Sequence, residues 1–127
     1  MNLQSLQLAL CAFNFGAICF VQVVHYPLFA DVPEAVFKEY HRKHVQKTTL
    51  LLGTTLTLEM FLNIFLMDLV PLLLLGMGWG ITFLVSVPQH RNLEKGFSRE
   101  AHRVLLLSNL GRVLCWGSLC TYHLVTQ

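Results

Sequence analysis

Hydrophobic and polar positions are separated into long blocks along this chain. Four stretches are almost continuously apolar, at residues of about 5–25, 48–67, 71–88 and 104–125. Each is close to the roughly 20 residues with which an α-helix crosses a hydrocarbon core about 30 Å thick. The pattern predicts an all-α fold, a four-helix transmembrane bundle, in which residues 1–127 form a single integral membrane domain.

The polar segment before the second apolar stretch carries a helical signal of its own. It contains neither Gly nor Pro between Pro33 and Gly53, and it is predicted to be an amphipathic helical extension that runs into the second span. The first apolar stretch lacks the basic start and the small-residue cleavage site of a signal peptide. We therefore expect it to remain in the protein.

Composition and charge agree with a membrane protein and indicate its orientation. The chain is 54% hydrophobic and 13% charged, with a mean hydropathy of +0.56, which excludes an ordinary soluble domain. Of nine basic residues, four lie between the first two spans and four between the last two. The positive-inside rule predicts that these loops are cytoplasmic and that both termini lie on the opposite side. A net charge of +2 gives no support for nucleic-acid binding, so the expected partners are the lipid bilayer and a lipophilic small molecule.

Four polar side chains are expected at a similar depth inside the spans. Asn14, Glu59, Asn109 and Arg112 come out roughly 10 to 17 Å from the cytoplasmic end, at about 1.5 Å per helical residue. A lone Glu or Arg at that depth costs about 2.5 to 3.5 kcal/mol, so the pattern predicts a Glu59–Arg112 ion pair that the asparagines hydrogen-bond. These four are the candidate catalytic residues. The layer either fixes the helix register or forms the floor of a polar cavity.

A polar stripe continues from this layer toward the cytoplasmic mouth of the bundle. At 100° per residue, every helix presents a polar face, and these faces must converge because lipid cannot satisfy them. The histidines on them are His25, His41, His44, His90 and His102. The stretch YHRKH, residues 40–44, sets two of these rings one turn apart, a spacing that suits iron, zinc or copper. The prediction is a histidine-lined vestibule that holds a metal ion, with iron favoured; the alternative is a set of ordinary interfacial histidines.

Other side chains on these faces are candidates for binding a cofactor or substrate. Gln22 lies on the stripe of the first helix, and Tyr26 and Trp116 could stack on a planar molecule or serve as packing residues. The chain has no Glu-x-x-His pair and no HxxHH box, which disfavours di-iron carboxylate and desaturase sites. Bis-histidine haem b remains an alternative to non-haem iron.

Three further classes of function are compatible with a four-helix membrane bundle. A quinone-coupled thiol oxidoreductase is disfavoured, because the four cysteines lie within the spans and form no CxxC. A small proton-coupled transporter could use Glu59, although a cation at the depth of Arg112 would hold that carboxylate ionised. The third is a non-catalytic haem- or quinone-binding anchor for a soluble partner. A homo-oligomer stays open, since GMGWG at residues 76–80 is a small-residue packing motif.

Five segments together resemble a group of known proteins. They are VQVVHYPLF, YHRKH, LE at residues 58–59, VPQHRNLEKGF and SNLGRVLCW. The chain resembles small bacterial four-helix membrane proteins that are distantly similar to the anthrone-oxygenase-like membrane family. This resemblance implies a bacterial inner-membrane location and the oxidation of a flat lipophilic substrate, such as an anthrone or a quinol, by molecular oxygen. The expected function is a membrane-embedded, metal-dependent oxidoreductase.

Overall fold

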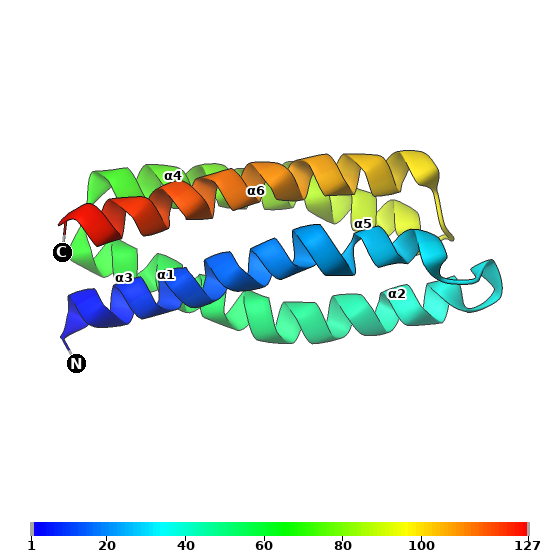
Figure 1. Ribbon diagram of the computed structural model, residues 1–127, viewed down its shortest axis with the longest axis horizontal. Helices are drawn as coiled ribbons and strands as arrows, with labels where there is room; N and C mark the ends of the chain where they lie inside the picture. Colours follow the sequence, from blue (N-terminus) through cyan, green and yellow to red (C-terminus); the bar gives the residue numbers. More distant parts are fainter. Residues whose placement is uncertain (1, 127) are drawn as a thin grey trace.

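The computed structural model of the protein describes residues 2–126 and consists of four long helices that run side by side (Figure 1). The long helices span Leu3–Asp31, Glu34–Leu66, Leu69–Leu93 and Arg99–Thr126, and each is long and apolar enough to cross a membrane. Within residues 2–126 every assigned element is helical. The all-α four-helix prediction is therefore confirmed.

The four long helices are divided into shorter elements with different helical geometry. In chain order these elements are α1 (Leu3–Phe20), η1 (Val21–His25), η2 (Pro27–Asp31), α2 (Glu34–Thr48), η3 (Thr49–Gly53), α3 (Thr54–Leu66), α4 (Leu69–Ile81), η4 (Thr82–Ser86), α5 (Val87–Leu93) and α6 (Arg99–Thr126). The predicted helical extension is α2, which continues through η3 into α3 as one helix.

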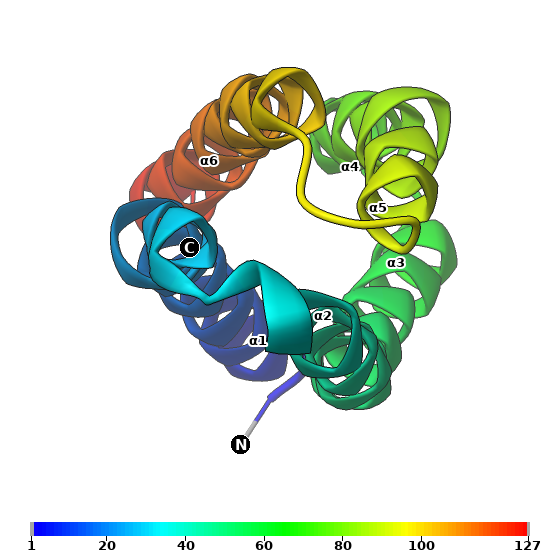
Figure 2. The same cartoon turned by 90° about the vertical axis from the view of Figure 1, so that its right-hand side faces the viewer.

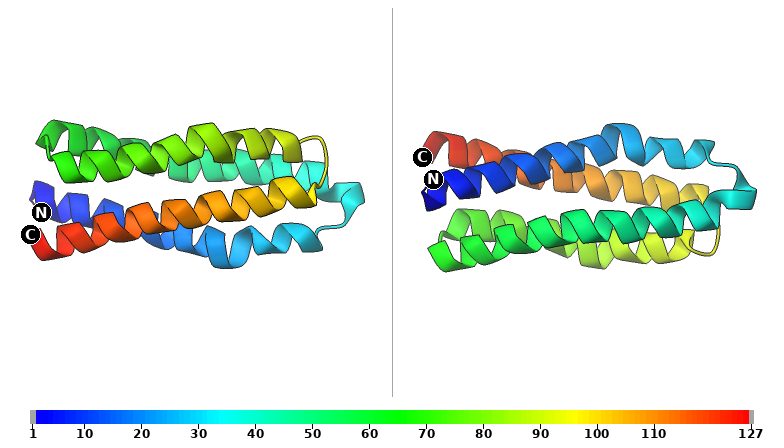
Figure 3. Two further views of the ribbon diagram at one scale, coloured as in Figure 1. Left: turned by 90° about the horizontal axis from the view of Figure 1, so that it is seen from above. Right: turned by 90° about the horizontal axis from the view of Figure 1, so that it is seen from below.

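The helices form a closed ring of neighbours when the bundle is seen along its axis (Figure 2). α1 packs on α6, α6 on α4, α4 on α3, and α3 on α1. Both chain ends lie together at one end of the bundle, as predicted from four spans (Figure 3). The other end carries α2, α5 and the start of α6, and with them eight of the nine basic residues. We call these the terminal end and the basic end.

Three of the four long helices contain a π-helical stretch, namely η1, η3 and η4. In η1 the Tyr26 N–H donates to the carbonyl of Val21, five residues back, at 2.9 Å. Two of the stretches come just before a proline, Pro27 after η1 and Pro88 after η4. Proline has no N–H and its ring clashes with the carbonyl four residues earlier, so a locally wider helix relieves that clash.

The third π-helical stretch, η3, lies in a threonine-rich segment and has no nearby proline. The hydroxyls of Thr54 and Thr57 donate to the carbonyls of Leu50 and Gly53, each at 2.6 Å. These bonds satisfy backbone oxygens at a depth where hydrocarbon offers no alternative donor.

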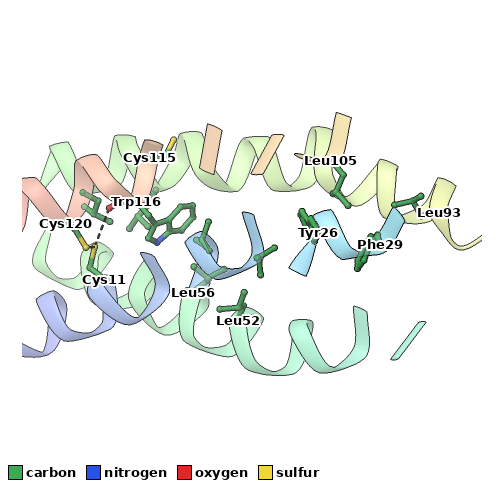
Figure 4. Close-up of a cluster of buried hydrophobic side chains, with 14 of the residues drawn as sticks. Cys11, Tyr26, Phe29, Leu52, Leu56, Leu93, Leu105, Cys115, Trp116 and Cys120 are labelled. Atoms are coloured by element: carbon green, nitrogen blue, oxygen red, sulfur yellow. Dashed lines mark hydrogen bonds between the residues drawn. The ribbon is translucent and has the colours of Figure 1, made fainter. Parts of the chain in front are cut away.

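Buried side chains form a column along the bundle axis (Figure 4). Trp116 on α6 lies in this column and is 1% exposed. It packs directly on Gly78 of α4, where a built Cβ atom would come within 2.2 Å of the indole ring. Gly76 and Gly80 have no neighbour within 4 Å of such an atom. The middle glycine of GMGWG is therefore used for packing within the chain.

Candidate functional site

Four of the five predicted histidines meet near the basic end of the bundle. His25 ends η1, His41 and His44 lie on α2, and His90 lies on α5. The ring centroid of His44 is 4.4 Å from that of His25 and 5.6 Å from that of His90, and the His41 and His90 centroids are 5.2 Å apart. Three long helices thus contribute to one group of imidazoles, which we call the histidine cluster. The predicted convergence is confirmed for these four residues.

The ring nitrogens of the histidine cluster face one another in pairs. His25 Nε2 is hydrogen-bonded to His44 Nδ1, and His41 Nε2 lies 3.0 Å from His90 Nδ1. The second pair is extended by Tyr26, whose hydroxyl lies 3.0 Å from His90 Nε2. Tyr26, His90 and His41 therefore form a continuous hydrogen-bonded chain.

The pairing determines what the histidine cluster could hold. A metal ion needs several ligand nitrogens directed at one point about 2.0 to 2.1 Å away, whereas here the nitrogens point at each other. In the part of the chain that the structure describes, no group of three or more His, Cys, Asp or Glu side chains is arranged to hold a metal ion. Metal binding would therefore need rotation of these rings.

His102 lies beside the histidine cluster but is engaged differently. Its Nε2 donates to the backbone carbonyl of Tyr26 at 2.7 Å. Its ring approaches Phe97 and Phe29, at 5.4 and 6.2 Å between centroids. His102 therefore links α6 to the residue before η2 through this hydrogen bond and does not belong to the histidine cluster.

Phe29 encloses the histidine cluster and was not predicted as part of the site. This fully buried ring on η2 lies 5.0 Å from His44 and 5.8 Å from His41, between ring centroids. His41 itself is fully buried. The four rings pack against one another and against Phe29; His41 and His44 are buried, and His25 and His90 are half-buried. The sequence HYPLF, residues 25–29, contained one signal for Phe29: it is an aromatic residue in the short segment that follows the candidate ligand His25.

Two of the four residues of the predicted polar layer, Asn14 and Glu59, share one network deeper in the bundle, and Glu59 is its centre. Glu59 is fully buried, and its Oε2 accepts from Asn14 Nδ2 at 2.7 Å and from Trp116 Nε1 at 2.8 Å. The network also includes two residues that were not predicted, Asn63 and Gln7, which lie toward the terminal end. Asn63 Nδ2 donates to the Glu59 carbonyl at 2.8 Å, and Gln7 Nε2 donates to Asn63 Oδ1 at 2.6 Å.

The predicted ion pair between Glu59 and Arg112 is wrong. Among residues 2–126 the ion pairs are those of Glu39 with Arg42 and Lys43, on the surface of α2. The indole of Trp116 contacts both groups instead: it donates to Glu59, and the Arg112 guanidinium lies 5.8 Å from its ring centre. A large side chain therefore occupies the place that a direct pair would need.

Arg112 belongs to a second polar group with Asn109 and Gln22. Its Nη1 donates to Asn109 Oδ1 at 3.3 Å, and Asn109 Nδ2 donates to Gln22 Oε1 at 2.9 Å and to the Ile18 carbonyl at 3.2 Å. The Nε–H of Arg112 is buried without a partner, as is Oε1 of Glu59. Each group therefore keeps one polar atom that could bind something further.

A cavity of about 200 Å³ lies between the histidine cluster and the Arg112 group. Its inner wall includes His90, Tyr26, Asn109 and Arg112, and all three π-helical stretches contribute to it. Phe83, which is 61% exposed, lies at its outer rim. The complete lining is Ile18, Val21, Tyr26, Thr48, Thr49, Leu52, Gly53, Leu56, Trp79, Thr82, Phe83, Ser86, Val87, His90, Asn109 and Arg112.

Tyr26 and Trp116, which were predicted to stack on a planar molecule, lie in different places. Tyr26 is at the cavity wall and also contacts the histidine cluster. Trp116 is packed in the core between Gly78 and Glu59 and does not line the cavity. Gln22 acts through its bond to Asn109.

Fold and site together define a class: a four-helix, all-α protein with helices that can span a membrane. Its largely apolar cavity carries a histidine, a tyrosine and an arginine on the inner wall. No protein-family model, curated protein or solved structure matches the chain.

Proposed function

We propose that this protein is a membrane-embedded oxidoreductase that oxidises a lipophilic substrate bound in the cavity. The observation that carries the proposal is the cavity wall, which includes Tyr26, His90 and Arg112. Tyr26 and His90 begin a hydrogen-bonded chain that ends at His41, and the Nε–H of Arg112 has no partner. A hydrogen-bonded chain can take up a proton, and a guanidinium can stabilise an oxygen that becomes negative. Oxidation of a phenolic or enolic hydroxyl needs both.

The cavity suits a flat, largely apolar molecule that arrives from the bilayer. An apolar cavity of about 150 Å³ is known to hold benzene, so about 200 Å³ accommodates one or two fused rings. The rim is surrounded by exposed apolar side chains, such as Leu50 on η3 and Leu84 on η4, which are 75% and 80% exposed. A quinol or an anthrone entering sideways between η3 and η4 would keep its hydroxyl toward Arg112 and the rest of its rings toward lipid.

The proton would leave the substrate along the hydrogen-bonded chain. Tyr26 lines the cavity and reaches His90, which in turn reaches His41. Each of these side chains can accept a proton on one side and release one on the other. The guanidinium of Arg112 would hold the oxyanion while the electrons depart.

A metal ion in the histidine cluster would provide the electron acceptor. Imidazole suits iron, zinc and copper, and iron is the metal we propose, as non-haem iron or alternatively as bis-histidine haem. His25 and His44 would hold it after their paired nitrogens turn apart, which leaves the Tyr26–His90–His41 chain intact. When bound, iron would supply one-electron chemistry with dioxygen.

The resemblance to the anthrone-oxygenase-like membrane family supports the same substrate class. By the positive-inside rule, the basic end would face the cytoplasm of a bacterial inner membrane. The histidine cluster would then lie near the cytoplasmic surface.

Elemental analysis and an optical spectrum of the detergent-purified protein test the metal. We expect stoichiometric iron that His44→Ala loses and that His123→Ala, a variant at the terminal end, retains; a Soret band would identify haem. Iron-free wild-type protein after reconstitution with ferrous salt or haemin would refute the metal centre.

Oxygen uptake with an anthrone or a quinol tests the chemistry. Tyr26→Phe removes one hydroxyl from the proton chain and leaves the ring in place. We expect the rate to fall by about 10²-fold or more, as for loss of a general base. A rate equal to that of the wild type would show that the chain does not carry the proton.

One observation favours a second candidate, a small proton-coupled transporter. Glu59 is fully buried, takes part in no ion pair among residues 2–126, and has no hydrogen-bond partner at Oε1. The objection from a Glu59–Arg112 pair is therefore removed. Proton-driven uptake of a cationic dye into proteoliposomes that Glu59→Gln abolishes would support transport. Absence of any such uptake in the wild type would exclude it.

A further inference from the structure

Two thiols lie in contact on neighbouring helices, in a place that the proposed oxidation does not use. Cys11 is on α1 and Cys120 on α6, both are buried, and their Sγ atoms are 2.9 Å apart (Figure 4). Both are free thiols, as are Cys19 and Cys115 on the same two helices. A disulfide bond is about 2.05 Å long, so the Cys11 and Cys120 sulfurs need to approach by only about 0.9 Å.

The inner side of this pair is the Glu59 network. The Cys11 Sγ lies 3.9 Å from the Trp116 carbonyl oxygen, and the indole of the same Trp116 donates to the Glu59 carboxylate. Glu59 Oε1 has no hydrogen-bond partner and is the oxygen that would accept the thiol proton. Thiolate, and not thiol, is the species that reacts with oxidants and disulfides.

The outer side of the pair is open to lipid. Cys120 lines a groove between α1 and α6, together with apolar residues that include Phe15 and Leu114. Leu114 is 65% exposed on the outer face, and the Phe15 ring would lie 3.2 Å from a Cβ atom at Gly117. A hydrocarbon-soluble molecule can therefore come close to one sulfur without entering the bundle.

We propose that Cys11 and Cys120 form a redox-active dithiol that a lipid-soluble quinone oxidises to an intramolecular disulfide. Two S–H bonds break and one S–S bond forms. The two electrons and two protons reduce the quinone to its hydroquinone. Glu59 accepts the Cys11 proton first and returns to the carboxylate as the quinone becomes protonated. An oxidant reached through lipid must take both electrons and both protons, which is what a quinone does.

The disulfide would tie α1 to α6 beside the Glu59 layer. This reaction is independent of the histidine cluster and of the cavity, because neither cysteine lines that cavity.

Treatment of the reduced full-length protein with duroquinone tests the proposal. This quinone is fully methylated, so it accepts electrons but resists addition of a thiol. After alkylation of the remaining thiols and digestion, we expect one cross-linked peptide containing Cys11 and Cys120, with Cys19 and Cys115 alkylated. One hydroquinone should form for each disulfide.

Matched variants separate this pair from the other thiols. Cys19→Ser/Cys115→Ser should give the same disulfide and the same hydroquinone yield, while Cys120→Ser should give neither. Four alkylated thiols in wild-type protein after both duroquinone and diamide would overturn the proposal. A disulfide formed with diamide but not with duroquinone would overturn the assignment of a quinone as oxidant.

Discussion

Replacement of Gly78 by alanine tests the packing that organises the polar layer. The added methyl carbon would lie 2.2 Å from Cζ3 and 2.7 Å from Cη2 of Trp116, well below ordinary van der Waals contact. Trp116 must move, because the atoms on the other side of the contact are the backbone of α4. Its Nε1 donates to Glu59 at 2.8 Å, and a shift of more than about 1 Å takes that bond out of the normal range.

The expected loss has two parts. Overpacking a well-filled core costs about 1 to 3 kcal/mol, and a side-chain hydrogen bond between membrane helices contributes about 0.6 to 2 kcal/mol. We therefore expect Gly78→Ala to lower the free energy of unfolding by about 2 to 5 kcal/mol relative to a glycine-to-alanine change without the clash. The reference is needed because alanine also raises helix propensity, by about 1 kcal/mol.

The same helix offers that reference. Gly76→Ala and Gly80→Ala add the same methyl group where nothing lies within 4 Å, and they should be neutral or stabilising. Equilibrium unfolding in mixed micelles, followed by tryptophan fluorescence, measures all three variants. If Gly78→Ala were as stable as Gly76→Ala, the indole would not be fixed between Gly78 and Glu59, and the account of the polar layer would be wrong.

Two further pairs of variants test the polar layer and the enclosure of the histidines. Glu59→Gln keeps an oxygen for the donors of Asn14 and Trp116, so its free energy of unfolding should stay within about 1 kcal/mol of the wild type. Glu59→Leu leaves both buried donors unpaired and should lower the free energy of unfolding by about 1 to 3 kcal/mol for each donor. Equal losses for the two variants in denaturant titrations would contradict this. Phe29→Ala should destabilise the protein by about 3 to 5 kcal/mol and speed the reaction of the histidines with diethyl pyrocarbonate. The exposed neighbour Leu28→Ala should do neither, and unchanged labelling of Phe29→Ala would show that this ring does not shield the cluster.

The fold could be predicted from the sequence because one physical demand dominates it. A chain in hydrocarbon must satisfy its backbone within helices, so four apolar runs lead directly to four spans. The long helices extend further at the basic end than the apolar runs predict. The first span was expected to end near residue 25, at HYP, but η1 widens before Pro27 and the helix continues to Asp31.

The convergence of the histidines could also be predicted, from the polar stripes on each helix. The details of their contacts could not. The stripes assume a rotation of about 100° per residue, and three π-helical stretches change that rotation between the polar layer and the histidine cluster. Each stretch turns the residues that follow it relative to those that precede it. The paired nitrogens of His41 and His90 therefore depend on a geometry that the sequence pattern does not contain.

The predicted Glu59–Arg112 ion pair is wrong for a different physical reason. Depth along a helix can be counted from sequence, and both residues do belong to buried polar groups. Their partners depend on which side chain fills the space between them, and Trp116 fits there because Gly78 leaves room for it. Glycine and tryptophan on separate helices give no sequence signal that links them.

Separation of the two polar groups has a consequence for how variants are interpreted. The cavity is lined by Tyr26, His90, Asn109 and Arg112, whereas Glu59 is not part of its lining and accepts from Asn14 and Trp116. Distant sites without shared partners act additively, while contacting residues do not. A change at Glu59 should therefore alter the stability of the bundle and the oxidation of the thiols, and a change at Tyr26 should alter substrate oxidation alone. Arg112 contacts both the cavity and Trp116, so it is the residue through which the two groups could influence each other.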